Sequence, residues 1–348
     1  MTVVLVVLAV AFAWSMGAHY TGACMGMPHA LRAVKAWQAL VVMAPLALLG
    51  AAVASHAVEH TVADRLTAHP LGTGAELIVI GVSFALTTAF TQGKVPTSTI
   101  QILVFAVAGA ALGDGVGVAW STIGLLAVVW VLAPVVAAAL GFALTRALDR
   151  VPVASPRPAP APAVGAAPAV GAGPTEPSAA LGSRPADAGG VLAAALVVVG
   201  AAASFVMGSN DVANATGSLV ATRTFSPLVA GVVGGGGLAL GVLTWGRPLL
   251  RRVAFDIVTL DRSMATAAQG VQAAVVITAV GFGLFTSMNQ ALVGAMAGAG
   301  AARGRHTVNR RVLVGIVRGW AIGPGAGIAL AYLVARAVVA VAGRGALA

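Results

Sequence analysis

The sequence predicts an all-α polytopic membrane protein made of two inverted-topology repeats, with broken helices or re-entrant hairpins at the midplane of the bilayer. Three observations lead to this fold class. Of the 348 residues, 59% are hydrophobic and 9% are charged, and apolar runs of spanning length recur throughout the chain. These runs lack the alternation of a membrane β-barrel, which leaves helices. Two motifs of the first half also recur in the second half.

Composition limits the partners of the chain. The net charge of +10 invites a nucleic-acid function, but the arginines stand at the ends of apolar runs, where membrane topology explains them. We therefore expect a lipid bilayer around the protein and no nucleic acid bound to it. Cys24 is the only cysteine, which excludes a disulfide within the chain and a cysteine-based metal cluster. Composition leaves open whether the protein forms a homo-oligomer.

The start of the chain and its arginine usage bear on location. The first 18 residues, MTVVLVVLAVAFAWSMGA, have no basic segment before the apolar run, so they predict a retained first span rather than a cleaved signal peptide. Arginine outnumbers lysine 18 to 2, which is typical of a GC-rich bacterial genome. We therefore expect a multi-pass protein of a bacterial plasma membrane.

A tract rich in proline, alanine and glycine divides the chain. Residues 151–189 read VPVASPRPAPAPAVGAAPAVGAGPTEPSAALGSRPADAG, and proline at this density prevents helix formation, so a flexible linker is expected. The predicted organisation is a first transmembrane repeat at 1–147, a linker at 148–189 and a second transmembrane repeat at 190–348.

The two halves repeat each other. TSTIQILVFAVAG (97–109) matches TSMNQALVGAMAG (286–298) at an offset of 189, and MGAHYTGACMG (16–26) matches MGSNDVANATG (207–217) at an offset of 191. Two matched pairs at nearly the same offset indicate an internal duplication.

The positions of the arginines predict that the repeats are inverted. Arg146 just before the linker and Arg150 at its start place the linker in the cytoplasm. From there, spans expected at about 190–221 and 226–245 bring the Arg-rich segment 246–262 back inside, and a last span at about 312–339 ends outside. Inversion of the first half then puts the Arg-poor loop 55–72 outside, whereas parallel repeats would place both segments on one side. Both termini are expected to be extracytoplasmic.

One long stretch carries no charge at all. It runs from Arg262 to Arg303, and it is long enough for two crossings or for a hairpin that returns to its own side. Either arrangement leaves the basic residues that follow it in the cytoplasm.

Asp211 lies in the apolar stretch VMGSNDVANATGS (206–218). A carboxylate at bilayer depth costs about 3 kcal/mol or more unless it is solvated, paired or protonated. Because no lysine or arginine is near it in sequence, its expected partner is a bound cation or a proton. Asn210 and Asn214 add neutral oxygen ligands for a hard cation. Gly208 is expected to permit a helix break, with Ser209 or Asn210 capping the helix that follows.

Each half offers a second irregular element rich in hydroxyls and amides. Inverted repeats bring such elements together near the midplane, where helix N-termini and side-chain donors favour an oxyanion. A site of this kind suits an anion that is carried together with Na⁺ or H⁺.

These residues resemble a known family. GSNDVANATG is similar to the signature G-A-N-D-x-A-N-A-x-G of the inorganic phosphate transporter (PiT) family, and PTSTIQ (96–101) is similar to its second element, P-V-S-T-T-(H/Q). The resemblance implies a symporter, not an enzyme, that moves inorganic phosphate with Na⁺ or H⁺ as the coupling ion and uses no cofactor. It also implies two sets of residues. The substrate-binding set is Ser98, Thr99, Gln101, Ser287, Asn289 and Gln290, and the ion-coupling set is Asn210, Asp211 and Asn214.

The first repeat departs from the family pattern. Where N-D-x-x-N is expected, this chain has His19-Tyr20-Thr21-Gly22-Ala23, and Phe285-Thr286-Ser287-Met288-Asn289 stands in place of P-V-S-T-T. The first departure lies in the first repeat and the second in the second repeat, so the cation half-site of the first repeat is degraded while that of the second is intact. We add His19 to the ion-coupling set as a hypothesis, because an imidazole with a reference pKa of about 6.5 can carry a proton in place of a cation.

Other functions remain open at this stage. Another tetrahedral oxyanion, such as sulfate, is the alternative substrate. HAVEH (56–60) matches the H-x-x-E-H pattern of a zinc hydrolase, in which His56 and His60 would hold the metal and Glu59 would act as base, with His69 or Glu76 completing the site. A relative that has lost transport and serves as a scaffold is a third alternative.

Overall fold

The computed structural model of the chain describes residues 1–93, 97–150, 186–250, 260–304 and 310–348. Within these ranges the secondary structure is helical apart from one isolated bridge between Thr67 and Val118. Eight of the described helices are long and apolar enough to cross a membrane. The predicted fold class, an all-α polytopic membrane protein, is confirmed.

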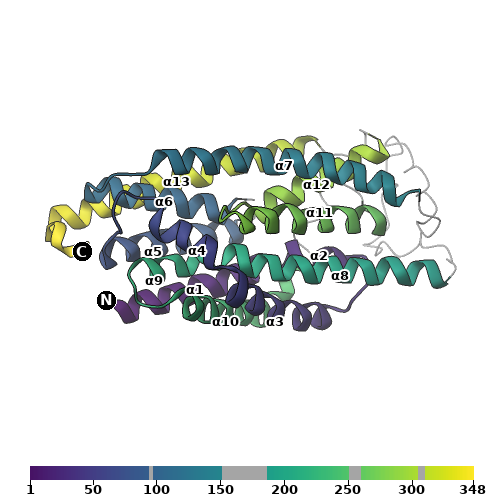
Figure 1. Cartoon of the computed structure of the whole chain (residues 1–348), viewed down its shortest axis with the longest axis horizontal. Helices are drawn as coiled ribbons and strands as arrows, with labels where there is room; N and C mark the ends of the chain where they lie inside the picture. Colours follow the sequence, from purple (N-terminus) through teal and green to yellow (C-terminus); the bar gives the residue numbers. More distant parts are fainter. Residues whose placement is uncertain (94–96, 151–185, 251–259, 305–309) are drawn as a thin grey trace, which may run out of the picture.

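The helices form one elongated bundle in which most axes follow the long direction (Figure 1). Both termini lie at one end of this bundle, and the ends of α7 and α8 that flank residues 151–185 lie at the other. The first half contains α1 Thr2–His19, α2 Thr21–Ala30, α3 Ala36–Ala54, α4 His56–Asp64, α5 Thr73–Gln92, α6 Thr99–Asp114 and α7 Trp120–Leu148. The second half contains α8 Ala186–Asp211, α9 Ala213–Ala221, α10 Pro227–Trp245, η1 Arg247–Leu249, α11 Arg262–Gly281, α12 Met288–Arg303, α13 Arg310–Ala342 and η3 Arg344–Ala346.

The spans predicted for the second half are present. Candidate membrane spans run over Gly190–Ala221, Pro227–Trp245 and Val317–Ala342. The helix α8 begins at Ala186, before the start at residue 190 that the sequence predicts. Of the predicted linker, 151–185 lies outside the described residues.

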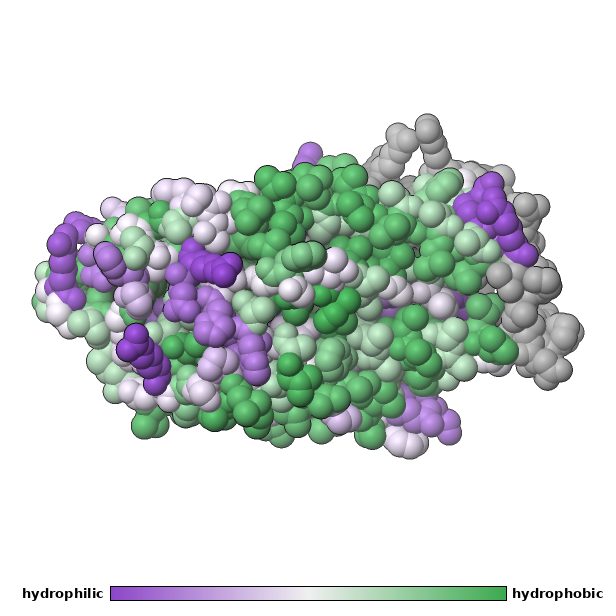
Figure 2. Space-filling model, in the orientation of Figure 1, coloured by the Kyte–Doolittle hydropathy of each residue, from purple (hydrophilic) through white to green (hydrophobic). Residues whose placement is uncertain are grey.

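Hydrophobic side chains cover the middle of the bundle. Figure 2 shows them over the central part of one face, with hydrophilic residues gathered toward the end that holds the termini. This distribution matches a protein whose middle faces lipid and whose ends face water.

Two long spans, Thr2–Ala30 and Gly190–Ala221, are interrupted about two thirds of the way along, and the interruption differs from the expected one. The helix α1 gives way to α2 at Tyr20, and α8 gives way to α9 at Val212. Gly208, expected to permit the break, lies inside α8, and neither Ser209 nor Asn210 caps α9. Gly208 instead allows close packing, because a Cβ there would overlap the backbone carbonyl of Ala47 in α3.

The charge-free stretch forms a hairpin of α11 and α12. The helix α12 has 16 residues and covers about 24 Å, less than the ~30 Å of hydrocarbon, which favours a re-entrant segment over a second crossing. Its end returns to the start of α11, because Arg303 Nη2 lies 3.1 Å from Asp261 Oδ2. Arg303 also pairs with Asp149 at the end of α7, at 2.6 Å. These contacts hold the ends of three helices together.

Close helix contacts at glycine link the two halves. In each case a glycine of one half lies against a backbone carbonyl of the other half. The residues at the corresponding positions of the two halves, about 190 residues apart, make the same contact with the roles of the halves exchanged. The pairs are Gly17 with Leu238 and Gly208 with Ala47, and Gly50 with Phe205 and Gly241 with Trp14. Gly109 of α6 meets Ile328 of α13, and Gly298 of α12 meets Ala138 of α7. This reciprocity agrees with a duplicated chain, while the inverted orientation of the repeats stays a prediction.

We predict that Gly50→Ala lowers the stability of the protein. The added Cβ overlaps Phe205 O. The backbone must shift to remove this overlap, which lowers the free energy of unfolding by about 1–3 kcal/mol. Gly236→Ala is the matched control in α10, because a Cβ there meets nothing within 4 Å and alanine favours helix. Thermal unfolding in detergent measures both variants. Equal midpoints for the two would contradict the close α3–α8 contact.

Candidate functional site

Asp211 is fully buried at the end of α8, with an exposed fraction of 0%. The Asn210 side-chain amide donates to its Oδ2 at 3.1 Å, while Oδ1 has no partner. Among the described residues, no lysine or arginine forms an ion pair with it. The carboxyl group therefore faces neither open water nor a permanent cation, which is the environment predicted for a residue that binds a cation or a proton.

The Asn210 side chain connects the end of α8 to the second hairpin, which is formed by α11 and α12. Its Nδ2 donates to Thr286 O at 2.9 Å, and its Oδ1 accepts from Thr286 N at 3.2 Å. Both ends of the amide are thereby used by the backbone just before α12. The structure thus brings Asp211 and the element around Ser287 together, and Asn210 is the residue that joins them.

Tyr20 takes the place of a carboxylate in the first repeat. It stands 191 positions before Asp211, at the offset of the duplicated motif. Its hydroxyl lies 2.7 Å from Thr99 Oγ1 at the start of α6, and it also interacts with the Asp211 carboxyl group. The phenol therefore bridges the buried acid and the first hairpin, which is formed by α5 and α6. Tyr20 was not among the site residues predicted from the sequence; its position at the duplication offset from Asp211 was the available signal.

His19 lies between two hairpins in a neutral form. Its Nδ1 is 2.8 Å from Thr91 Oγ1, and its Nε2 is 3.3 Å from Asn289 Nδ2. The Thr91 hydroxyl proton is already donated to Thr87 O at 2.7 Å, so Nδ1 must be the donor toward Thr91. Nε2 then accepts from the Asn289 amide, which leaves one proton on the ring. A second proton on His19 requires that the Asn289 amide rotate, so that its oxygen instead of its nitrogen faces Nε2.

The substrate-binding candidates sit at the N-termini of α6 and α12. Ser98 and Ser287 cap these helices, accepting from the backbone N–H of Gln101 at 3.4 Å and of Gln290 at 3.3 Å. All the predicted substrate-binding residues except Asn289 are buried, and Asn289 is half-buried. The structure therefore places them on two matching helix starts.

Several buried oxygens near these elements have no hydrogen-bond partner. An unpartnered buried acceptor costs about 1–3 kcal/mol, so such atoms mark places where a ligand is expected. They are Asp211 Oδ1, Asn214 Oδ1, Gln101 Oε1, Gln290 Oε1 and Thr286 Oγ1.

Two glutamines of α11 support the site and were not predicted. Gln269 Nε2 donates to the carbonyls of Ala23 and Cys24, both at 2.8 Å. Gln272 Nε2 donates to Met288 O at 3.3 Å. They connect α11 with the start of α2 and the start of α12. Two amides three residues apart in a charge-free apolar stretch were the available signal.

The zinc-hydrolase alternative finds no support. Glu59 is fully buried and contacts Thr216 Oγ1 at 2.8 Å, whereas His60 is 59% exposed and pairs with Asp64. His56 and His60 thus do not converge with Glu59 on one point. No group of three His, Cys, Asp or Glu side chains that could hold a metal ion occurs among the described residues.

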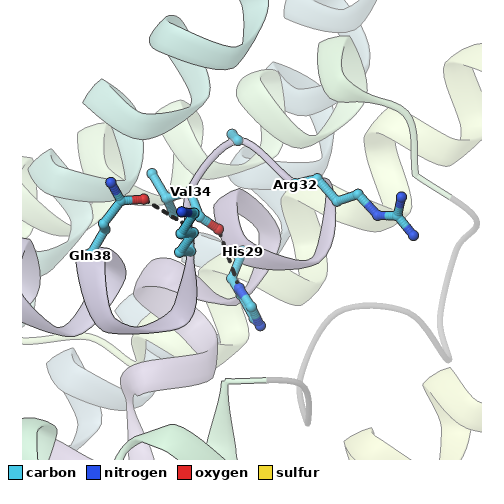
Figure 3. A pocket seen from close by; sticks show the side chains of 6 residues that line it. His29, Arg32, Val34 and Gln38 are labelled. Atoms are coloured by element: carbon cyan, nitrogen blue, oxygen red, sulfur yellow. Dashed lines mark hydrogen bonds between the residues drawn. The ribbon is translucent and has the colours of Figure 1, made fainter.

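A pocket of about 390 Å³ lies elsewhere, at the loop between α2 and α3 (Figure 3). Its lining includes His29, Arg32, Lys35 and Gln38. In Figure 3 the Arg32 and His29 side chains point in different directions, so these two side chains do not converge on one ligand position. The pocket shares no residue with the cluster around Asp211.

Comparisons with known proteins point to one family. The chain matches the model described as the phosphate transporter family over residues 16–331. A Haemophilus influenzae protein named as a candidate phosphate permease is 34% identical over 151 residues, 40% of this chain and 36% of that protein. The mouse sodium-dependent phosphate transporter 1 is 29% identical over 127 residues, 34% of this chain and 19% of that protein. The chain therefore matches well under two thirds of the length of these relatives.

The fold has a counterpart among solved structures. A structure titled "The sodium-dependent phosphate transporter" superimposes with a TM-score of 0.82 at 20% identity, covering 98% of this chain and 99% of that one. At this identity the likeness establishes the shared fold.

We predict that Asn210→Ala destabilises the protein by about 2–3 kcal/mol. The substitution leaves the N–H and the carbonyl of Thr286 without the amide that now pairs with both, and each unpaired buried group costs about 1–3 kcal/mol. Asn289→Ala serves as control, because it removes a single 3.3 Å contact with His19. Thermal unfolding in detergent should separate the two variants. An Asn210→Ala midpoint equal to that of the wild type would show that the two hydrogen bonds to Thr286 do not stabilise the protein.

Proposed function

The chain belongs to the phosphate transporter family, whose model matches residues 16–331, and from this premise we propose that it moves inorganic phosphate across a membrane by symport with Na⁺ or H⁺. The observation that carries the proposal is the buried Asp211, which has an unpartnered oxygen and no cation beside it in the described part of the chain. A transported cation or proton would neutralise it in each cycle. The family consists of transporters, and no enzymatic activity is proposed.

The coupling ion would be held by Asp211 and Asn214. Each has an unpartnered buried oxygen, and carboxylate and amide oxygens are ligands for hard cations. Asn210 has a different part, because both ends of its amide are used by Thr286. We propose that Asn210 positions Asp211 against the second hairpin. The mouse relative and the solved structure are both described as sodium-dependent phosphate transporters, which favours Na⁺ as the coupling ion here.

Phosphate would bind between the starts of α6 and α12. Helix N-termini attract anions through their free N–H groups and dipoles, and both helices are capped by a serine that can still donate its hydroxyl proton. Gln101 and Gln290 add side-chain amide donors. Thr99 and Asn289 are engaged by Tyr20 and His19, so they would reach the anion only after those contacts open.

The first repeat would bind no cation of its own. At the positions that correspond to Asp211 and Asn210, the chain carries Tyr20 and His19, whose hydrogen bonds are satisfied by the protein itself. A phenol and a neutral imidazole bring no negative charge to attract a cation. We therefore propose fewer coupling ions per phosphate than in a chain with two intact signatures.

The membrane orientation follows from the arginines and is part of the proposal. The linker would lie in the cytoplasm of a bacterial cell and both termini outside the plasma membrane. The position of the termini at one end of the bundle, opposite the ends of α7 and α8, supports this orientation (Figure 1). The reciprocal glycine contacts support the inverted repeats.

We predict that Asp211→Asn reduces coupled phosphate uptake at least about tenfold, since interactions with a charged group contribute about 1.5–3 kcal/mol. Labelled phosphate uptake into proteoliposomes, with Na⁺ and pH gradients imposed separately, measures the effect. Asp64→Asn is the control, because this carboxylate is 58% exposed on α4. His19→Gln is expected to alter the pH dependence of uptake.

Three outcomes bear on the alternatives. Full uptake by Asp211→Asn contradicts the ion-coupling role. Inhibition by sulfate as strong as by unlabelled phosphate favours a general oxyanion permease. A wild-type protein that takes up no phosphate under any gradient favours the scaffold function.

A further inference from the structure

A second buried carboxyl group lies outside the cluster around Asp211. Glu59 sits on the short helix α4, outside the eight candidate spans, with an exposed fraction of 0%. One oxygen, Oε2, has no hydrogen-bond partner, and no ion pair within the described ranges includes Glu59. A carboxylate without a partner is costly in such a place, so the protonation state of Glu59 has to be deduced from its neighbours.

The Thr216 hydroxyl can serve Glu59 in either protonation state. Thr216 Oγ1 lies 2.8 Å from Glu59 Oε1, the ordinary O–H···O distance, and 3.0 Å from Val212 O. A charged Glu59 accepts the hydroxyl proton of Thr216, whereas a protonated Glu59 can donate to Thr216 Oγ1 while Thr216 donates to Val212 O. Ser55, which also faces Glu59, donates to Ala51 O at 2.6 Å. The contacts of Glu59 therefore fit both a protonated and a charged carboxyl group.

We propose that Glu59 is a proton-binding residue of this transporter, separate from Asp211, and that its protonation decides which acceptor Thr216 serves. With the proton on Glu59, Thr216 donates to Val212 O, at the break between α8 and α9. When Glu59 loses the proton to water, Thr216 donates its own proton to the carboxylate, and Val212 O keeps only its backbone hydrogen bonds from Ala215 N and Thr216 N. The break next to Asp211 thereby responds to the proton. This inference rests on the proposed transport function.

Burial keeps the proton on Glu59 near neutral pH. It raises the pKa of the Glu59 carboxyl from 4.5 to about 7, against the opposing effects of Thr216, Ser55 and His60. The raised pKa means that Glu59 is protonated below about pH 7 and charged above it. The switch therefore operates in the range in which a pH gradient drives transport.

The elements packed against α4 supply few other titratable groups. These elements are α9, α10 and α11. Neither α9 nor α10 contains an ionisable side chain, and the one in α11, Arg262, contacts Leu31 O. On α4 itself, His60 and Asp64 pair with each other at the surface, and His56 is the remaining group. Glu76 of α5 is a further buried carboxyl, which faces Ser218 on α9.

Infrared spectroscopy of the full chain in detergent tests proton binding without transport. A protonated carboxyl group gives a carbonyl band that disappears on deprotonation. Asp211 and Glu76 are also buried and can contribute to this band, so the Glu59 component is the difference between wild type and Glu59→Gln. We expect this difference to titrate with a midpoint of about pH 7, and we expect the spectrum of Asp64→Asn to equal that of the wild type. Thr216→Val, which keeps Glu59 but removes a contact that lowers its pKa, should move the midpoint upward. This second variant keeps the test decisive if Glu59→Gln fails to fold.

Proteoliposomes test the link to transport. Glu59→Gln mimics the protonated form, because its amide can donate to Thr216 permanently. We expect this variant to retain phosphate exchange at equal pH but to lose the stimulation of uptake by an imposed proton gradient, with Asp64→Asn behaving as wild type. A Glu59→Gln variant that keeps either the full intensity of the titrating wild-type band or the gradient response overturns the proposal. If the wild type moves no phosphate, the proposed function fails, while the infrared band still decides whether Glu59 holds a proton.

Discussion

A carboxyl group that is closed off from water has to be neutralised, and at Asp211 the described part of the chain supplies amides and hydroxyls but no permanent positive charge. The surrounding architecture follows from this constraint. Asn210 holds the acid against the second hairpin, and Tyr20 brings the first hairpin to it. Because the remaining charge can be balanced only by something that arrives from solution, the occupancy of the site and the arrangement of the hairpins are energetically coupled.

The sequence predicted those parts of the structure that depend on local pattern. Apolar runs fixed the spans, and a single acid in one of them identified Asp211, since a charge in such a run is costly wherever the rest of the chain lies. The repeated motifs placed Ser98 and Ser287 at equivalent helix starts, and the serine side chains do cap those helices.

Contacts between distant segments could not be predicted in the same way. The pairing of Tyr20 with Thr99 joins residues 79 positions apart, and that of Glu59 with Thr216 joins residues 157 apart. Such pairs depend on the tertiary packing of the helices, which local helix propensity does not determine. For the same reason the expectation that Gly208 permits a helix break was wrong, and Gly208 instead allows close packing against α3. The H-x-x-E-H pattern failed likewise, because the fold turns Glu59 inward.

The reciprocal glycine contacts have a mechanical consequence. The helices α1 and α10 approach each other to backbone distance, as do α3 and α8, α6 and α13, and α7 and α12, and every one of these pairs joins a helix of the first half to a helix of the second. Interfaces this tight resist sliding and separation. The two halves of the gene product therefore cannot tilt against each other as separate blocks. Any body that moves as a unit must therefore contain packed helices from both halves of the chain.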